Sequence, residues 1–122
     1  MDAAAPISGP GHERPEIVCI CGSTRFKDAM LDASRQLTLA GSIVLAPGVF
    51  SHAEPGTEIS AEQKAKLDEL HLWKIDLADR VLVVNPGGYF GESTRREISY
   101  SRKTGKPVEF THPGGAQAPG SS

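Results

Sequence analysis

Residues 91–101, GESTRREISYS, contain a glutamate whose type and spacing allow two different roles. Glu97 lies three residues after Thr94, directly behind the apolar run and glycine-rich turn VLVVNPGGYF. A threonine followed at this spacing by a glutamate is typical of a capping box, in which both side chains bond the backbone at a helix start. A carboxylate at the same place could instead attack a substrate as a nucleophile. The spacing alone favours the cap.

The composition of the same segment favours a functional role. The helix that we expect from about Thr94 is short, and Ile98 is its one clear core residue, with Tyr100 partly so. A helix kept only for packing carries a fuller apolar stripe. Its first two turns are nearly all polar, which makes Glu97 a candidate for contact with a ligand.

A second polar loop follows the first expected strand and offers four candidate binding residues, Gly22, Ser23, Thr24 and Arg25. Glycine lets the backbone approach a ligand closely, and the free amides of a helix start attract an anion. The arginine could hold a phosphate or carboxylate in a two-pronged contact. The ordinary alternative is a glycine turn, a hydroxyl that caps the helix and a solvated arginine. The spacing of the loop excludes a P-loop.

The glycine-rich loop before the last helix is the richer candidate. Its glycines allow a tight backbone that follows a ligand, and Tyr89 could stack on a base. Trp73 could stack as well, although we expect it in the core or in a dimer contact, and His52 could reach the ligand from another loop. The candidate substrate-binding residues here are Gly88, Tyr89, Gly91, Ser93 and Thr94.

Strand and helix patterns alternate along the chain. Short apolar runs predict strands at 16–21, 42–47, 80–85 and, weakly and at an edge, 107–110. Helical periodicity or capping signals predict helices within 24–41, over 61–78 and from 94 to about 104. We therefore expect a small doubly wound, flavodoxin- or Rossmann-like α/β fold, with a mostly parallel sheet and helices on both faces. Ligands bind such folds beyond the carboxyl ends of the strands, which here means loops 22–25, 46–59 and 85–94.

Composition and charge indicate the extent of the folded domain and exclude some classes of partner. Residues 1–15 and 111–122 are rich in small residues and proline, so we expect two flexible tails around one domain at 16–110. The net charge of −2 argues against a nucleic-acid polymer as partner. No apolar run approaches the roughly 20 residues that span a membrane, and the first residues lack the pattern of a signal peptide. The sequence therefore predicts a cytoplasmic protein that does not bind membranes.

The two cysteines lie close together on the first expected strand. Cys19 and Cys21 point to the same side of an extended chain, where residues so close rarely form a disulfide. A zinc site would be expected to show more ligands at finger-like spacing. We therefore expect two buried free thiols and no metal site.

The motifs described above resemble those of the nucleoside 2-deoxyribosyltransferase-like superfamily, which includes deoxyribosyltransferases and nucleotide N-glycoside hydrolases. The segment STRREISYS resembles the G-T-x-x-E-[IL]-G-x-A signature, and ICGSTRF is similar to the strand and Gly-Ser substrate loop. DLADRVLVVN is similar to the helix end, A-D pair and buried strand. The resemblance covers nearly all of 16–110. It implies that Glu97 attacks the anomeric carbon of a sugar and forms a glycosyl-enzyme, from which water or a second base takes the sugar.

Two departures from the family pattern affect the expected site. Ser93 replaces a glycine, which could add a hydroxyl towards a phosphate. The family also has an aspartate eight residues before the A-D pair, and that position, counted back from Asp79, is His71. His71 could act as a general acid near neutral pH. Its ordinary alternative is a structural histidine of the core or surface.

Three aspartates are possible substitutes for the missing one. Asp68 and Asp76 lie on the same expected helix as His71, and Asp79 follows its end. Asp76 and Asp79 would sit at the negative end of that helix, which favours their protonated form and suits proton donation. The alternatives are a solvated charge for Asp76 and a turn residue for Asp79.

These observations lead to a main prediction with alternatives. The main one is cleavage or transfer at the N-glycosidic bond of a nucleoside 5′-monophosphate or (deoxy)nucleoside. An anion site at Ser23, Arg25 and Ser93 favours the monophosphate and hydrolysis. PGGYFGE is also similar to the P-G-G-x-G-T-x-x-E loop of cytokinin-type phosphoribohydrolases, although with an extra residue. A nucleotide-binding or sensor module without catalysis is the alternative from another class. The chemistry needs no metal or cofactor, and the resemblance implies a homodimer or higher homo-oligomer.

Overall fold

The computed structural model describes residues 13–50, 53–56 and 58–113. Within them, strands and helices alternate along the chain. The strands are β2 (Ile17–Cys21), β3 (Ile43–Leu45), β4 (Arg80–Val83) and β5 (Val108–Phe110). The helices are α1 (Lys27–Leu39), α2 (Ala61–Leu77), the 3₁₀ turn η1 (Pro86–Gly88) and α3 (Glu92–Lys103). The described part of the chain holds no helix that is long and apolar enough to cross a membrane.

The strands form one parallel sheet in the order β3-β2-β4-β5. After β2 the chain crosses to one side of the sheet, and after β4 it crosses to the other. The chain therefore leaves the carboxyl ends of the two central strands in opposite directions, and this is the point where doubly wound sheets bind ligands. The prediction of a small, parallel, doubly wound α/β fold is confirmed, and β5 is an edge strand as expected.

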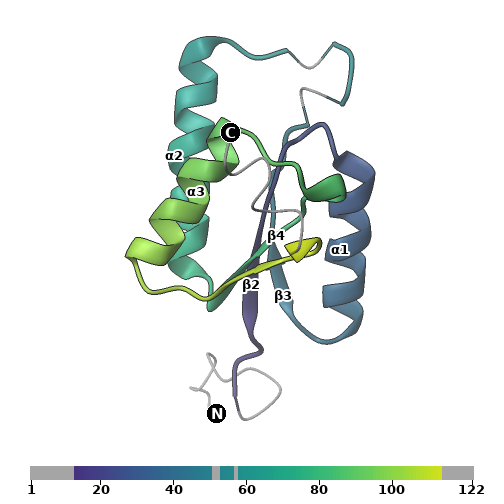
Figure 1. Cartoon of the computed structure of the whole chain (residues 1–122), viewed down its shortest axis with the longest axis vertical. Helices are drawn as coiled ribbons and strands as arrows, with labels where there is room; N and C mark the ends of the chain where they lie inside the picture. Colours follow the sequence, from purple (N-terminus) through teal and green to yellow (C-terminus); the bar gives the residue numbers. More distant parts are fainter. Residues whose placement is uncertain (1–12, 51–52, 57, 114–122) are drawn as a thin grey trace, which may run out of the picture.

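Helices cover both faces of the sheet, with α2 and α3 on one side and α1 on the other (Figure 1). Because side chains alternate along a strand, β2 serves both layers. Cys19 and Cys21 face the layer of α2 and α3, where they pack with Ile75 and Ile98. Ile20 faces α1 and packs against Met30. This alternation places both thiols on the face that carries α2 and α3.

The helix starts were predicted correctly for α2 and wrongly for α3. Ser60 and Gln63 form the expected capping box, with Gln63 N donating to Ser60 Oγ at 3.0 Å and Ser60 N donating to Gln63 Oε1 at 2.9 Å. Helix α3 begins at Glu92, after an extended Gly91 and without a side-chain cap. Thr94 is therefore the third residue of the helix and is buried, so it cannot be the N-cap that the sequence predicted.

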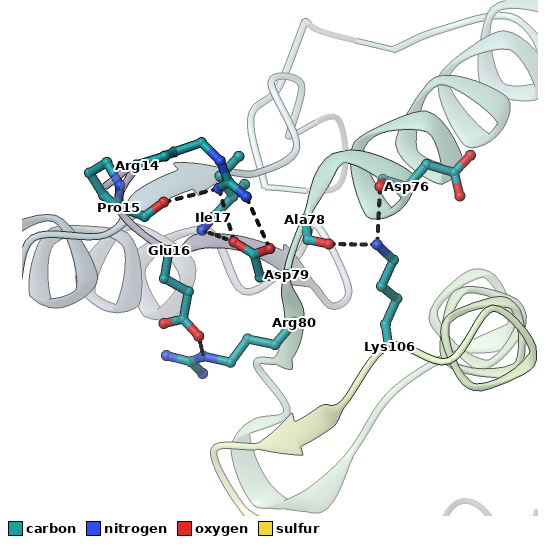
Figure 2. A network of polar contacts seen from close by, with 9 residues as sticks. All are labelled: Arg14, Pro15, Glu16, Ile17, Asp76, Ala78, Asp79, Arg80 and Lys106. Atoms are coloured by element: carbon teal, nitrogen blue, oxygen red, sulfur yellow. Dashed lines mark hydrogen bonds and ion pairs between the residues drawn. The ribbon is translucent and has the colours of Figure 1, made fainter. Parts of the chain in front are cut away.

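At the edge of the sheet where the strands begin, charged side chains form hydrogen bonds and ion pairs between neighbouring segments (Figure 2). The carboxylate of Asp79 accepts hydrogen bonds from Ile17 N at 2.8 Å and from the Arg14 guanidinium at 3.0 and 3.3 Å. Lys106 Nζ donates to the carbonyls of Ala78 at 2.7 Å and Asp76 at 3.1 Å, at the end of α2. The hydrogen bond from Arg14, then that from Ile17, lowers the pKa of Asp79 to about 2.

The boundary of the carboxyl-terminal tail differs from the prediction. Asn85 is fully buried, and its side chain needs hydrogen-bond partners. Its Oδ1 accepts from His112 N at 3.0 Å, and its Nδ2 donates to His112 O at 3.1 Å, while Thr111 Oγ1 accepts from Asn85 N at 3.1 Å. Thr111 and His112 are therefore part of the folded domain. Arg14, also assigned to a tail, is fixed by Asp79. Residues 1–12 and 114–122 lie outside the described residues.

The pair between Asp79 and Arg14 predicts a specific acid dependence of stability. The pKa of Asp79 falls from 3.8 to about 2 on folding, so the ionised carboxylate stabilises the fold above pH 3.8. That stabilisation is lost as the pH falls from about 4 towards 2. Asp79→Asn should therefore lower the melting temperature at pH 7. The difference in melting temperature between the variant and the wild-type protein should disappear near pH 2.

The control for this measurement is Asp32→Asn, which removes an exposed carboxylate whose partner, Arg35, lies on the same helix. Thermal unfolding by circular dichroism at a series of pH values should show a smaller change for this variant. A gap for Asp79→Asn that stays constant from pH 7 to pH 2 would contradict the assignment.

Candidate active site

A pocket of about 260 Å³ opens at the carboxyl ends of β2 and β4. All three loops that the sequence singled out contribute to it, together with α2 and the first turns of α3. The predicted residues that line it are Gly22, Ser23, Thr24, Arg25, His71, Tyr89, Gly91, Ser93, Thr94 and Glu97. Gly88 does not line it; this residue is buried, and its N–H donates to Asn85 O at 2.7 Å.

Glu97 and His71 face one another in this pocket. Glu97 lies in the second turn of α3, and its side chain is 13 % exposed. His71 lies in α2 and is 8 % exposed, with Nε2 at 3.9 Å from Glu97 Oε1. The structure thus brings together a carboxylate and an imidazole from two helices, at the distance of an ion pair. Glu97 makes no cap; its carboxylate faces His71 and accepts a hydrogen bond from Cys21.

Two thiols lie against the same imidazole. Cys21 Sγ is 3.4 Å and Cys19 Sγ 3.6 Å from His71 Nε2, and both cysteines are fully buried and free. The prediction of buried free thiols is confirmed, but their contact with His71 was not foreseen. The sequence shows only that the two thiols share one side of a strand, and it contains no signal that a histidine about 50 residues later meets them.

The side chains of Glu97, His71 and the two cysteines shift one another's pKa values. Burial raises the pKa of Glu97, although the nearby His71 opposes the rise. Burial alone would lower the pKa of His71, but Cys19 and the Glu97 carboxylate outweigh it and raise that pKa. The hydrogen bond from Cys21 lowers the pKa of Cys19 to about 5, and the same contact with burial raises the pKa of Cys21. His71 therefore stays protonated to higher pH than a free histidine, which suits a proton donor.

Cations and hydroxyls surround the mouth of the pocket. The Arg25 guanidinium lies over the Tyr89 ring, 5.3 Å from its centroid, and no described carboxylate pairs with it. Lys64 Nζ donates to Ser93 Oγ at 3.0 Å and to both carboxylate oxygens of Asp68 at 3.0 and 3.1 Å. These groups form a polar rim that could bind an anion.

Lys64 is a functional candidate that the sequence analysis missed. It sits in the first turn of α2, and its only local signal is the i,i+4 pairing with Asp68. Its contact with Ser93 depends on how α2 packs against α3, since the two residues lie 29 positions apart. Asp68, considered earlier as a proton donor, lines the pocket too, but it is shared between Lys64 and, at 3.6 Å, Arg96.

Two of the proposed catalytic carboxylates lie outside the pocket. Asp76 accepts a hydrogen bond from Tyr100 Oη at 2.8 Å. Asp79 lies at the opposite edge of the sheet, where the Arg14 guanidinium and the Ile17 amide keep it ionised. The prediction that Asp79 favours its protonated form is wrong, because these two donors outweigh the helix dipole. Trp73 is 61 % exposed and is not a core residue, and His52 lies outside the described residues.

Comparison of the chain with protein-family models, with curated proteins and with solved structures gives no match. The chemistry of the pocket is therefore the basis on which a function can be proposed.

The glycine of the first loop has a packing role in addition to lining the pocket. A Cβ on Gly22 would lie 2.6 Å from the Val84 carbonyl oxygen and 2.8 Å from Met30 Cε. The backbone oxygen cannot move without disturbing β4. Gly22→Ala should therefore lower the free energy of unfolding by about 1–3 kcal/mol.

The matched control is Gly48→Ala in another pocket loop, where a Cβ meets nothing within 4 Å. Urea unfolding should leave that variant within about 0.5 kcal/mol of the wild-type protein. Equal losses of unfolding free energy in the two variants would show that the close approach of Gly22 to Val84 does not cause the destabilisation.

Proposed function

We propose that the protein cleaves the N-glycosidic bond of a nucleoside 5′-monophosphate, with Glu97 as nucleophile and a covalent glycosyl-enzyme as intermediate. The observation that carries the proposal is the Glu97 carboxylate, held in the pocket 3.9 Å from the His71 imidazole. The same residues would serve transfer of a (deoxy)ribosyl group if a second base took the place of water.

The rim of the pocket supports the choice of a monophosphate. Arg25 and Lys64 supply positive charge, and Ser23 and Ser93 supply hydroxyls, all of them in the pocket lining. Arg25 can exchange its contact with the Tyr89 ring for a two-pronged contact with a phosphate. A 5′-phosphate is the one group of such a substrate whose negative charge these cations complement. Tyr89, 39 % exposed and lining the pocket, presents an aromatic surface on which a base can stack.

The chemistry follows from the two facing groups. A Glu97 carboxylate oxygen forms a bond to C1′ of the sugar while the bond from C1′ to the base nitrogen breaks, and its electron pair leaves with the base. His71 donates its Nε2 proton to the departing base. Neutral His71 then accepts a proton from the water that attacks C1′ and releases Glu97. The products are the free base and the sugar phosphate.

Burial serves this reaction in two ways. A desolvated carboxylate is a stronger nucleophile than a hydrated one, and it stabilises the positive charge that develops on the sugar. The raised pKa of His71 supplies a proton near neutral pH without the aspartate that is absent from its position. His71 therefore takes the role that the sequence analysis considered for it.

Replacing the nucleophile tests the proposal directly. Glu97→Gln keeps the shape of the side chain but removes the attacking carboxylate, so base release should fall by about a thousandfold or more. The measurement is chromatography of free base after incubation with nucleosides and nucleoside 5′-monophosphates, ribo and deoxy. The control, Glu62→Gln, removes an exposed carboxylate from the first turn of α2, outside the pocket lining, and should keep most of the activity.

Two results would contradict the proposal. If no substrate releases base and a nucleotide stabilises both Glu97→Gln and the wild-type protein against heat, the protein is a binding module. Base release that survives in Glu97→Gln would assign the nucleophile to another residue.

Replacing Arg25 tests whether the pocket binds the 5′-phosphate of the substrate. If Arg25 holds the 5′-phosphate, Arg25→Ala should raise the KM for the monophosphate by about 10–100-fold and leave that of the matching nucleoside nearly unchanged. The control is Arg102→Ala, an exposed arginine in the last turn of α3. An equal rise for nucleoside and monophosphate would place the contact of Arg25 elsewhere on the substrate.

A further inference from the structure

The proposed reaction uses one nitrogen of His71 and gives the two buried thiols no bond to make or break. Cys19 Sγ, Cys21 Sγ and His71 Nε2 all lie within 4.8 Å of one another. The thiols come from β2 and the imidazole from α2, so the sheet and its helix layer hold the three atoms together. Both sulfur atoms point at the same nitrogen, at 3.4 and 3.6 Å.

In the metal-free protein, hydrogen bonds connect Cys19 with Cys21 and Cys21 with Glu97, and both thiols also contact His71. The Nε2 atom of a neutral imidazole has either one hydrogen or one lone pair, so it makes one good hydrogen bond at a time. Two sulfur atoms at nearly equal distance from it are more than that bond requires. Two thiolates and an imidazole are, in contrast, a common set of ligands for one zinc ion.

The two sulfur–nitrogen distances fit a tetrahedral ion. Zinc lies about 2.3 Å from a thiolate sulfur and about 2.0–2.1 Å from an imidazole nitrogen, so two such ligands are about 3.5 Å apart in a tetrahedral site. The two observed separations, 3.4 and 3.6 Å, bracket that value. The pocket supplies an entry path, because His71 and Glu97 both line it.

We propose that Cys19, Cys21 and His71 bind one thiophilic transition-metal ion, of which Zn²⁺ is the type, beside the substrate pocket. Thiolate and imidazole ligands select such ions over Mg²⁺ and Ca²⁺. Each thiol binds as thiolate and releases its proton to solvent. The fourth ligand is the Glu97 carboxylate, whose Oε1 lies 3.9 Å from Nε2.

Metal binding and base release exclude one another in this arrangement. The ion takes the Nε2 lone pair of His71, which removes the proton donor, and it occupies the Glu97 carboxylate. Zn²⁺ should therefore inhibit base release, and a chelator should restore it. This consequence rests on the proposed function, whereas metal binding itself does not.

The test is a titration of metal-free, reduced protein with Co²⁺, which reports its ligands by absorption. We expect about one equivalent to produce the near-ultraviolet charge-transfer band of a cobalt–thiolate bond and the visible bands of tetrahedral cobalt, and Zn²⁺ to displace it. Cys19→Ser and Cys21→Ser should each weaken binding by about a hundredfold or more. His112→Gln, which changes a histidine outside the cluster, should leave the spectrum unchanged.

A second measurement covers the case in which a serine variant does not fold. The chain has two cysteines, so any thiol reaction of the wild-type protein reports on this cluster. Zn²⁺ should slow their reaction with a small thiol reagent at least about tenfold. An unchanged reaction rate, a titration without the thiolate band, or a band that persists in both serine variants would overturn the proposal.

The two proposals fail in different ways. A cobalt–thiolate band in a protein that releases no base from any substrate would leave the metal site standing and refute the proposed function. Base release that disappears in Glu97→Gln, from a protein that shows no such band, would refute the metal site alone.

Discussion

The burial of the Glu97 carboxylate beside His71 is the constraint on which the rest of the pocket depends. An isolated buried charge is costly, and proteins keep one only when partners surround it. Here the partner is His71 on α2, which in turn contacts Cys19 and Cys21 on the central strand. Helix α3 has to lie against α2, and α2 over β2, for this chain of contacts to exist. A carboxylate whose pKa burial raises, held in a pocket with such partners, is typical of a functional site rather than of a stabilising one.

The stabilising ion pairs described above and the pocket lie at opposite edges of the sheet. At the edge where the strands begin, Arg14, Asp79 and Lys106 close the ends of strands and helix with ion pairs and hydrogen bonds (Figure 2). Arg80 adds a bridge there between Glu16 and Glu109. At the other edge, the loops after β2 and β4 form the pocket, with their polar groups facing it. A rigid scaffold that carries polar loops at the carboxyl ends of its strands is the usual arrangement of a doubly wound ligand-binding protein.

Local patterns in the sequence were sufficient for the element order, for the Ser60–Gln63 cap and for the loops that form the pocket, because each depends on residues close together in the chain. The errors arose where distant residues decide the outcome. Asp79 was misjudged because its partner Arg14 lies 65 positions away, and the meeting of His71 with Cys19 spans 52 positions. Thr94 matched a cap by spacing, but an extended Gly91 starts the helix three residues earlier than that cap requires. The place of Thr111 and His112 in the fold depends on the buried Asn85, which composition cannot reveal.

The central claim is that Glu97 forms a covalent bond to the sugar. The most direct measurement is mass spectrometry of the protein after reaction with a nucleoside 5′-monophosphate whose sugar carries fluorine at C2′, which slows the release of a glycosyl-enzyme by destabilising the positive charge on the sugar. The account predicts a protein whose mass has grown by that of the sugar phosphate without its base, with the addition on the peptide that contains Glu97. Base release from the unmodified substrate with no adduct, or an adduct on another residue, would contradict it.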